Sequence, residues 1–313
     1  MKRKLMIALL CLAMTAALFA CSAGLAEDVI SVETLTTEQL ANALKNDSAY
    51  RNNTLKLEDD FTLSAPDGEF YSCEQPITID LNGHTLALGA ATIKLNSYSA
   101  NLVIKDSSTD QNGQITGFGG GVSHYLIAVQ EGLLTVESGN VCGTVNGIAV
   151  NGDGILTISD GSVTAPNGAI YNKSGKVYIN GGSVIAAGKT GLLNENGEVT
   201  VSGGTVQANE GAIYSTGSNG KVKVESGAVK ATGAYAIQVD DGTLSIEDGT
   251  VEAASYAVLL KNGASCTVSG GSITAAGVPT IWLEGSDWYD EVTLKVTGGT
   301  ITQNGHEIGR AHV

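Results

Sequence analysis

The sequence is poor in basic residues. Lysine and arginine together number 17, against 32 aspartates and glutamates, which gives a formal net charge of −15. Proteins that bind nucleic acid use Lys and Arg side chains to neutralise phosphates. The shortage therefore excludes nucleic acid as a partner and is typical of a soluble protein whose surface repels other copies.

Cysteine is scarce as well. Beyond residue 26 the chain carries only Cys73, Cys142 and Cys266, an odd number of widely spaced residues without a CxxC pair. This spacing argues against a zinc or redox site and against a disulfide framework. Cys266 stands where neighbouring repeats carry Val or Leu, so we expect its side chain in the core.

Long apolar runs are absent except at the start of the chain. Residues 1–26 predict a secretory signal peptide, because a basic start precedes an apolar run and small residues precede Glu27. A buried helix is the alternative. The segment Leu18–Cys21 resembles a bacterial lipobox, a second processing route in which Cys21 is lipidated. We expect an extracellular or cell-surface protein whose only link to the membrane is a lipid on Cys21.

Glycine, by contrast, is abundant, with 41 residues that recur at fixed offsets. Eight segments follow one pattern, apolar-x-apolar-x-x-Gly-x-Val/Ile, where x is any residue. The glycines lie 21 to 23 residues apart until a last interval of 28. They are Gly139, Gly161, Gly182, Gly204, Gly227, Gly249, Gly271 and Gly299.

Each repeat holds three short runs with the alternation of a strand that buries one face. In one repeat these are 199–201, 205–208 and 211–214. Because one such coil cannot bury its own apolar side, we predict an all-β, right-handed parallel β-helix of about 10 coils of about 22 residues. The repeat glycine is expected at the bend between the first two strands, where a positive φ or a close approach of the backbone would exclude a Cβ. A leucine-rich horseshoe or a propeller would need a different pattern or period.

The two ends differ from the repeats. Thr36 to Gln39 has the spacing of a capping box, and Leu40, Ala43 and Leu44 share one helical face. We expect this short helix to cap the core. The predicted organisation is a signal peptide (1–26), an N-terminal cap with helix and entry strands (27–70), the β-helix (71–305) and a tail (306–313).

The stacked coils and the segment Asp80–Leu86 resemble the pectin-lyase-like superfamily of right-handed β-helices. More narrowly, the chain is similar to glycine-rich, repeat-built surface or secreted proteins of Gram-positive bacteria. The resemblance covers residues 30–305. It implies an extracellular polysaccharide lyase or hydrolase, an adhesin or a passive scaffold.

Residues for catalysis are sparse. A lyase of this kind needs an Arg or Lys base beside acidic calcium ligands, yet Arg51 and Arg310 lie outside the regular coils. A hydrolase needs two carboxylates on neighbouring coils, for which Glu225 and Glu247 near Lys223 are candidates. Further carboxylates stand in turns or in the last insertion: Asp240, Asp241, Glu284, Asp287 and Asp290. We assign no catalytic residue, metal ligand or cofactor.

A binding surface is predicted from the third run of each repeat. Aligning these runs by their inward residues puts one outward position in a row along the helix: Tyr171, Asn194, Tyr214, Gln238, Leu259 and Trp282. The insertion after Glu284 adds Trp288 nearby. Aromatic rings can stack on sugars while amides bind hydroxyls. Alternatively, tyrosine simply suits an exposed strand, and the insertion serves as a C-terminal cap.

We therefore expect a non-catalytic extracellular or surface protein for adhesion or carbohydrate binding, whose partner is a glycan or a surface protein. The alternative is a polysaccharide lyase or glycoside hydrolase. A second alternative is a purely structural scaffold, including a water-ordering surface on the threonines of the first run: Thr135, Thr157, Thr200 and Thr267.

Overall fold

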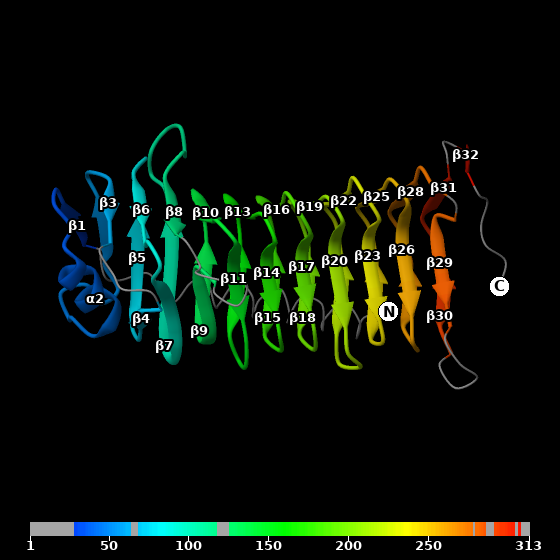
Figure 1. Cartoon of the computed structure of the whole chain (residues 1–313), viewed down its shortest axis with the longest axis horizontal. Helices are drawn as coiled ribbons and strands as arrows, with labels where there is room; N and C mark the ends of the chain where they lie inside the picture. Colours follow the sequence, from blue (N-terminus) through cyan, green and yellow to red (C-terminus); the bar gives the residue numbers. More distant parts are fainter. Residues whose placement is uncertain are drawn as a thin grey trace, which may run out of the picture.

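The computed structural model describes residues 28–63, 68–117, 125–277, 279–285, 291–303 and the backbone of 306–307. These residues form one elongated parallel β-helix of about 11 turns, each of about 22 residues (Figure 1). The leader with Cys21, the side chain of Trp288, Asp287, Asp290, Arg310 and most of the predicted tail lie outside the described residues.

Three ladders of parallel strands run along the helix, one for each run of the repeat. The first ladder contains β1 (Val29–Val32), β2 (Thr54–Leu57), β5 (Pro76–Asp80), β7 (Thr92–Lys105), β9 (Ile127–Val136), β12 (Ile155–Ile158), β15 (Lys176–Ile179), β18 (Glu198–Val201), β21 (Lys221–Val224), β24 (Thr243–Ile246), β27 (Ser265–Val268) and β30 (Thr293–Val296).

The second ladder contains β3 (Phe61–Thr62), β6 (Thr85–Ala87), β8 (Gln114–Gly117), β10 (Asn140–Gly143), β13 (Ser162–Ala165), β16 (Ser183–Ala186), β19 (Thr205–Ala208), β22 (Ala228–Ala231), β25 (Thr250–Ala253), β28 (Ser272–Ala275) and β31 (Thr300–Gln303). A short strand, β32 (His306–Glu307), pairs antiparallel with β31.

The third ladder contains β4 (Phe70–Cys73), the first part of β7 and of β9, β11 (Asn146–Val150), β14 (Gly168–Asn172), β17 (Thr190–Asn194), β20 (Gly211–Thr216), β23 (Tyr235–Asp240), β26 (Tyr256–Lys261) and β29 (Ile281–Glu284). The long strands β7 and β9 pair in both the third and the first ladder. The predicted parallel β-helix is confirmed. It has about one coil more than expected, because β2, β3 and β4 already pair with the ladders.

The core is a stack of Val, Ile, Leu and Ala side chains. In a representative coil, Val199, Val201, Val206 and Ile213 are fully buried. Burying such a side chain contributes about 1.5–3 kcal/mol, and the stacking repeats that gain in every coil. Cys266 is buried among these side chains, as predicted.

The repeat glycines have the predicted conformation. All eight have positive φ, between +63° and +90°. Gly204 has φ of +64°, and a Cβ there would press against the backbone of Gly181 and Gly182 in the preceding coil. An L-residue is therefore disfavoured twice, by the backbone conformation and by the neighbouring coil.

A helix covers the N-terminal end of the core, as expected (Figure 1, dark blue). In α2 (Thr37–Lys45) the Thr36 hydroxyl accepts from the Gln39 amide at 3.1 Å, and the Gln39 side chain accepts from the Thr36 amide at 2.9 Å. Leu40 and Leu44 are fully buried. No helix in the described part of the chain is both long and apolar enough to cross a bilayer.

Candidate functional site on the outward face of the third ladder

Most of the predicted row does form on the third ladder. Strand register aligns one outward position from β11 to β29, occupied by Ala149, Tyr171, Leu193, Tyr214, Gln238, Leu259 and Trp282. These strands lie side by side on one face of the helix (Figure 1). In the row Trp282 is 38% exposed, whereas Leu259 is only 8% exposed.

Asn194 is a correction to the predicted row. Leu193 occupies the outward position, while Asn194 aligns with Ser215 and is fully buried. The sequence prediction failed because alternation assigns the apolar Leu193 to the core and the polar amide to the surface. Two consecutive leucines in β17 leave the pattern ambiguous by one residue, and a one-residue slip exchanges the two faces of a strand.

Buried hydrogen bonds explain the inward position of Asn194. The Asn172 side-chain amide donates to Asn194 Oδ1 at 2.9 Å, and the Asn194 amide donates to Ser215 Oγ at 3.0 Å. The same Asn194 amide donates to the carbonyl of Gly197 at 3.0 Å in the following turn. These three side chains form a polar ladder inside the helix. Each hydrogen bond in it replaces a hydrogen bond to water that is lost when the side chain is buried. Asn194 is therefore structural.

Aromatic rings cluster in three pairs on the face. Tyr125 stacks on Tyr171 with ring centroids 5.7 Å apart, and Tyr214 meets Tyr235 edge-on at 6.4 Å. Tyr256 meets Trp282 edge-on at 5.2 Å. Edge-to-face and offset pairs of this kind hold rings in fixed orientations. The row is therefore broader than one position, because a second outward column contributes rings to it.

Tyr125 was missed by sequence reasoning. It lies two residues before Ile127, which pairs with Ile148. The signal was present, since the equivalent position in later coils carries Tyr235 and Tyr256, which pair with one another. The irregular coil before residue 125 hid the alignment.

Carboxylates stand beside the tyrosines. The Tyr214 hydroxyl donates to Asp240 Oδ2 at 2.8 Å, and the Gln238 amide donates to Asp240 Oδ1 at 2.8 Å. Glu195 occupies the equivalent position beside Tyr171. Asp240 aligns with Lys261 and, one coil further, with Glu284, and Lys261 Nζ lies 3.2 Å from Glu284. The face thus combines rings with fixed hydrogen-bond acceptors.

The tyrosines of the face remain protonated donors. Burial raises the pKa of Tyr214 to about 12, helped by the hydrogen bond to Asp240. Burial and the neighbouring Glu195 carboxylate also raise the pKa of Tyr171. Burial also raises the pKa values of Tyr125 and Tyr235. The hydroxyls therefore carry their protons throughout the physiological range.

The lysine and the two glutamates considered for catalysis bind one another. Lys223 Nζ lies 2.7 Å from Glu225 and 3.1 Å from Glu247 on the outward side of the first ladder. Hydrogen bonds to these carboxylates raise the pKa of Lys223. A lysine held in its charged form is a poor general base. This cluster is better explained as an ion-paired surface.

The other carboxylates have structural partners. Asp241 has φ of +59° in a turn and accepts from the Gly242 amide at 3.0 Å. In the entry segment, burial opposes ionisation of Asp106, but amides of Ser108, Gly113 and Gly83 donate to it and lower its pKa. Among the described residues, no group of three His, Cys, Asp or Glu side chains is arranged to hold a metal ion.

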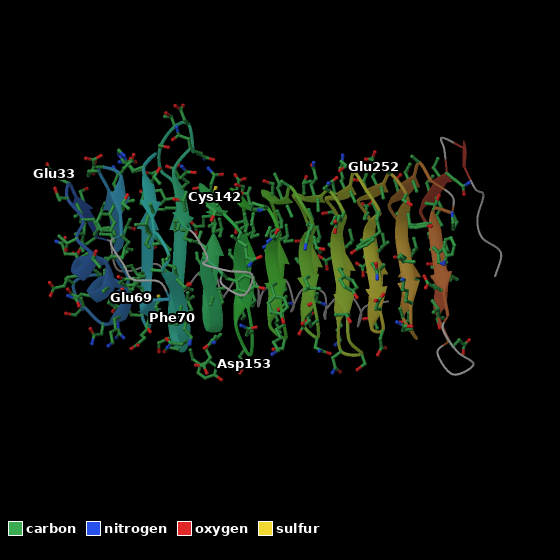
Figure 2. All side chains as sticks on the ribbon, in the orientation of Figure 1. Glu33, Glu69, Phe70, Cys142, Asp153 and Glu252 are labelled. Atoms are coloured by element: carbon green, nitrogen blue, oxygen red, sulfur yellow. The ribbon has the colours of Figure 1, made fainter. Side chains whose placement is uncertain are left out.

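The sides of the helix carry different chemistry. Figure 2 shows Asp153 in the turn after β11 and, on the opposite edge of the view, Cys142 on β10 and Glu252 on β25. Glu252 lies 3.6 Å from Lys230 on the second ladder. The first ladder shows the expected threonine row, interrupted by Tyr178, Lys223 and Ser245. Aromatic pairs among the described residues all lie on the third ladder.

The fold and this face define the class of the protein. It is a parallel β-helix of the right-handed type, with a capping helix at its N-terminal end and an aromatic face along its third ladder. The chain matches no protein-family model, no curated protein and no solved structure.

Proposed function

We propose that the protein is a non-catalytic carbohydrate-binding or adhesion protein that acts outside the cell. The observation that carries the proposal is the set of three aromatic pairs on one rigid face, two of which lie beside a carboxylate, Glu195 or Asp240. Rings offer flat apolar surfaces for sugar rings, and the neighbouring carboxylates, amide and hydroxyls supply hydrogen bonds.

The rigidity of the face supports the proposal. Five of the six paired rings are attached to strands that are paired on both sides or, for Trp282, to the last strand of the third ladder, so little ordering is needed when a ligand binds. Tyr125 lies two residues before β9 and stacks on Tyr171. Trp282 offers the most exposed ring of the row, at 38%. The contact face would extend from Tyr171 through Tyr214 and Gln238 to Trp282.

Export is part of the proposal. The basic and apolar pattern of residues 1–26 supports secretion, and Cys21 would hold the protein at the surface if the lipobox is used. Coil length, stacked ladders and glycine position support a relationship to the pectin-lyase-like superfamily and to the glycine-rich surface proteins of Gram-positive bacteria.

A glycan array tests the proposal with residues 27–313, which include every described strand. We expect binding without product release, with or without calcium. Tyr214→Ala and Trp282→Ala should each weaken binding, whereas Tyr178→Ala, an outward tyrosine on the first ladder, should not. Equal binding by all variants would reject the face. Product release would support the lyase or hydrolase alternative, and the absence of any binding would reject carbohydrate recognition.

A further inference from the structure

The tyrosine and carboxylate pairs on the third ladder repeat. Tyr214 donates to Asp240, and Glu195 occupies the same position relative to Tyr171 as Asp240 does relative to Tyr214, with each carboxylate on the coil that follows its tyrosine. Leu193 separates the two tyrosines in the row. The two pairs are therefore two coils apart, or about 9.6 Å at a strand spacing of about 4.8 Å.

From this repeat, and resting on the proposed function, we propose that the face selects linear glycans that are neutral or carry amino groups, and rejects glycans that carry carboxylates. The glycan lies along the helix axis, and the Tyr171–Glu195 and Tyr214–Asp240 pairs form two equivalent subsites.

The hydrogen-bonding capacity of the pairs sets the chemistry of the ligand. An ionised carboxylate only accepts hydrogen bonds, and each of its oxygens has two lone pairs. Asp240 uses one acceptor position per oxygen, for Tyr214 and for Gln238. The positions that remain can accept only from a donor group of the ligand, which in a glycan is a hydroxyl, an amide N–H or an ammonium group. A sugar carboxylate would face like charge.

Basic side chains do not reverse this preference. Lys261, the basic residue aligned with Asp240, is paired with Glu284 at 3.2 Å. Lys173 is exposed beyond the end of β14. The chain as a whole has a net charge of −15, which adds long-range repulsion of acidic polymers. An ammonium group at a subsite would instead form a charge-assisted hydrogen bond.

The alternation of subsites favours a linear ligand with a two-unit repeat. Along the row, the polar pair at Tyr171 is followed by the apolar Leu193 and then by the polar pair at Tyr214. A pyranose ring is similar in length to the rise of one coil. In an extended glycan whose successive rings show opposite faces, every second sugar presents the same groups. The repeat of such a glycan would therefore match the two-coil spacing of the subsites.

Calorimetry with three hexasaccharides tests the inference: cellohexaose, the hexamer of glucosamine in its protonated form, and the hexamer of galacturonate. We expect binding of the first two and none of the third. Added salt should weaken binding of the glucosamine hexamer and leave cellohexaose binding unchanged, because salt screens charged contacts.

Asp240→Asn keeps the shape of the side chain and removes its charge. It should weaken binding of the glucosamine hexamer by about tenfold, since a charge-assisted bond is roughly twice as strong as a neutral one. It should change binding of cellohexaose little. Asp241→Asn is the matched control, because Asp241 accepts from the Gly242 amide in the turn and should leave both affinities unchanged.

The outcomes distinguish failure of the selectivity from failure of the proposed carbohydrate-binding function. Binding of galacturonate hexamer that is lost in Tyr214→Ala would overturn the selectivity and keep the aromatic face as a glycan site. An equal effect of Asp240→Asn and Asp241→Asn would overturn the subsites. Absence of binding by all three hexamers would overturn both proposals.

Discussion

Gly204 stands at the bend between β18 and β19, where φ is +64° and the preceding coil leaves no room for a Cβ. The sequence predicted its place and that positive φ or a close backbone approach would exclude a Cβ there, and both hold, because the glycine period is set by backbone geometry that recurs in every coil. Tyr171 and Tyr214 were also placed correctly, since each directly follows an inward isoleucine, Ile170 or Ile213. The regular repeat makes these single positions predictable, and Asn194 is the exception within it.

Gly204→Ala tests the bend. The positive φ alone should cost about 1–2 kcal/mol, and the contact with Gly181 and Gly182 should add to this loss. Gly168→Ala is the control, because its only close neighbour is the Thr190 carbonyl at 3.7 Å and its φ is not positive. Urea denaturation should show a large loss for the first variant and a small change for the second. Equal losses would contradict the account of the bend.

Tyr214 gives a prediction of pH dependence. Its pKa rises from 10.0 to about 12 in the folded protein, so the unfolded chain loses this proton first as the pH increases. The stabilisation from this group is complete below pH 10 and is lost as the pH rises towards about 12. Thermal melts over that interval should show a smaller loss of stability in Tyr214→Phe than in the unmodified protein. An identical loss in both would contradict the assignment.

At the scale of elements, neighbouring strands are coupled by buried amides as well as by the backbone. The ladder from Asn172 through Asn194 to Ser215 links β14, β17 and β20. Sequence pattern did not predict it, because a polar residue in a short strand signals an outward position unless its hydrogen-bond partners are known. The same error assigned Asn194 to the ligand face.

Asn194→Ala should destabilise the protein, because it breaks both hydrogen bonds along the ladder and leaves the buried Ser215 hydroxyl without the amide that donates to it. The expected loss is about 1–3 kcal/mol, the cost of a buried group left unsatisfied. Asn196→Ala, in the exposed turn, should change stability little. If glycan binding fell in Asn194→Ala while the unfolding midpoint stayed constant, the structural role would be wrong.

The whole molecule is a stack whose two ends differ. The helix α2 covers the N-terminal end, and antiparallel β32 pairs with the last strand of the second ladder. In the last described coil Ile281, Leu294, Val296 and Ile301 are only partly buried. The sequence predicted the stack and its capping helix because composition and period are global properties. The sequence did not predict the aromatic pairs, since these depend on side-chain contacts between coils of unequal length.

The outward face of the third ladder is the proposed ligand-binding surface of the molecule. A regular helix offers three long outward faces, yet only the third ladder gathers aromatic rings beside carboxylates in the described residues. Sequence reasoning identified this ladder but missed the ring of Tyr125, which lies next to the irregular coil. The proposed function therefore depends on outward side chains, which differ from coil to coil while the inward pattern repeats.

Fluorescence of Trp282 tests the claim most directly. The chain has two tryptophans, so Trp288→Phe leaves Trp282 as the only indole reporter. The account predicts that cellohexaose or the glucosamine hexamer changes Trp282 emission in a saturable manner and protects the ring from acrylamide quenching. Saturable binding in calorimetry with unchanged emission and quenching at Trp282 would contradict a ligand site on this face.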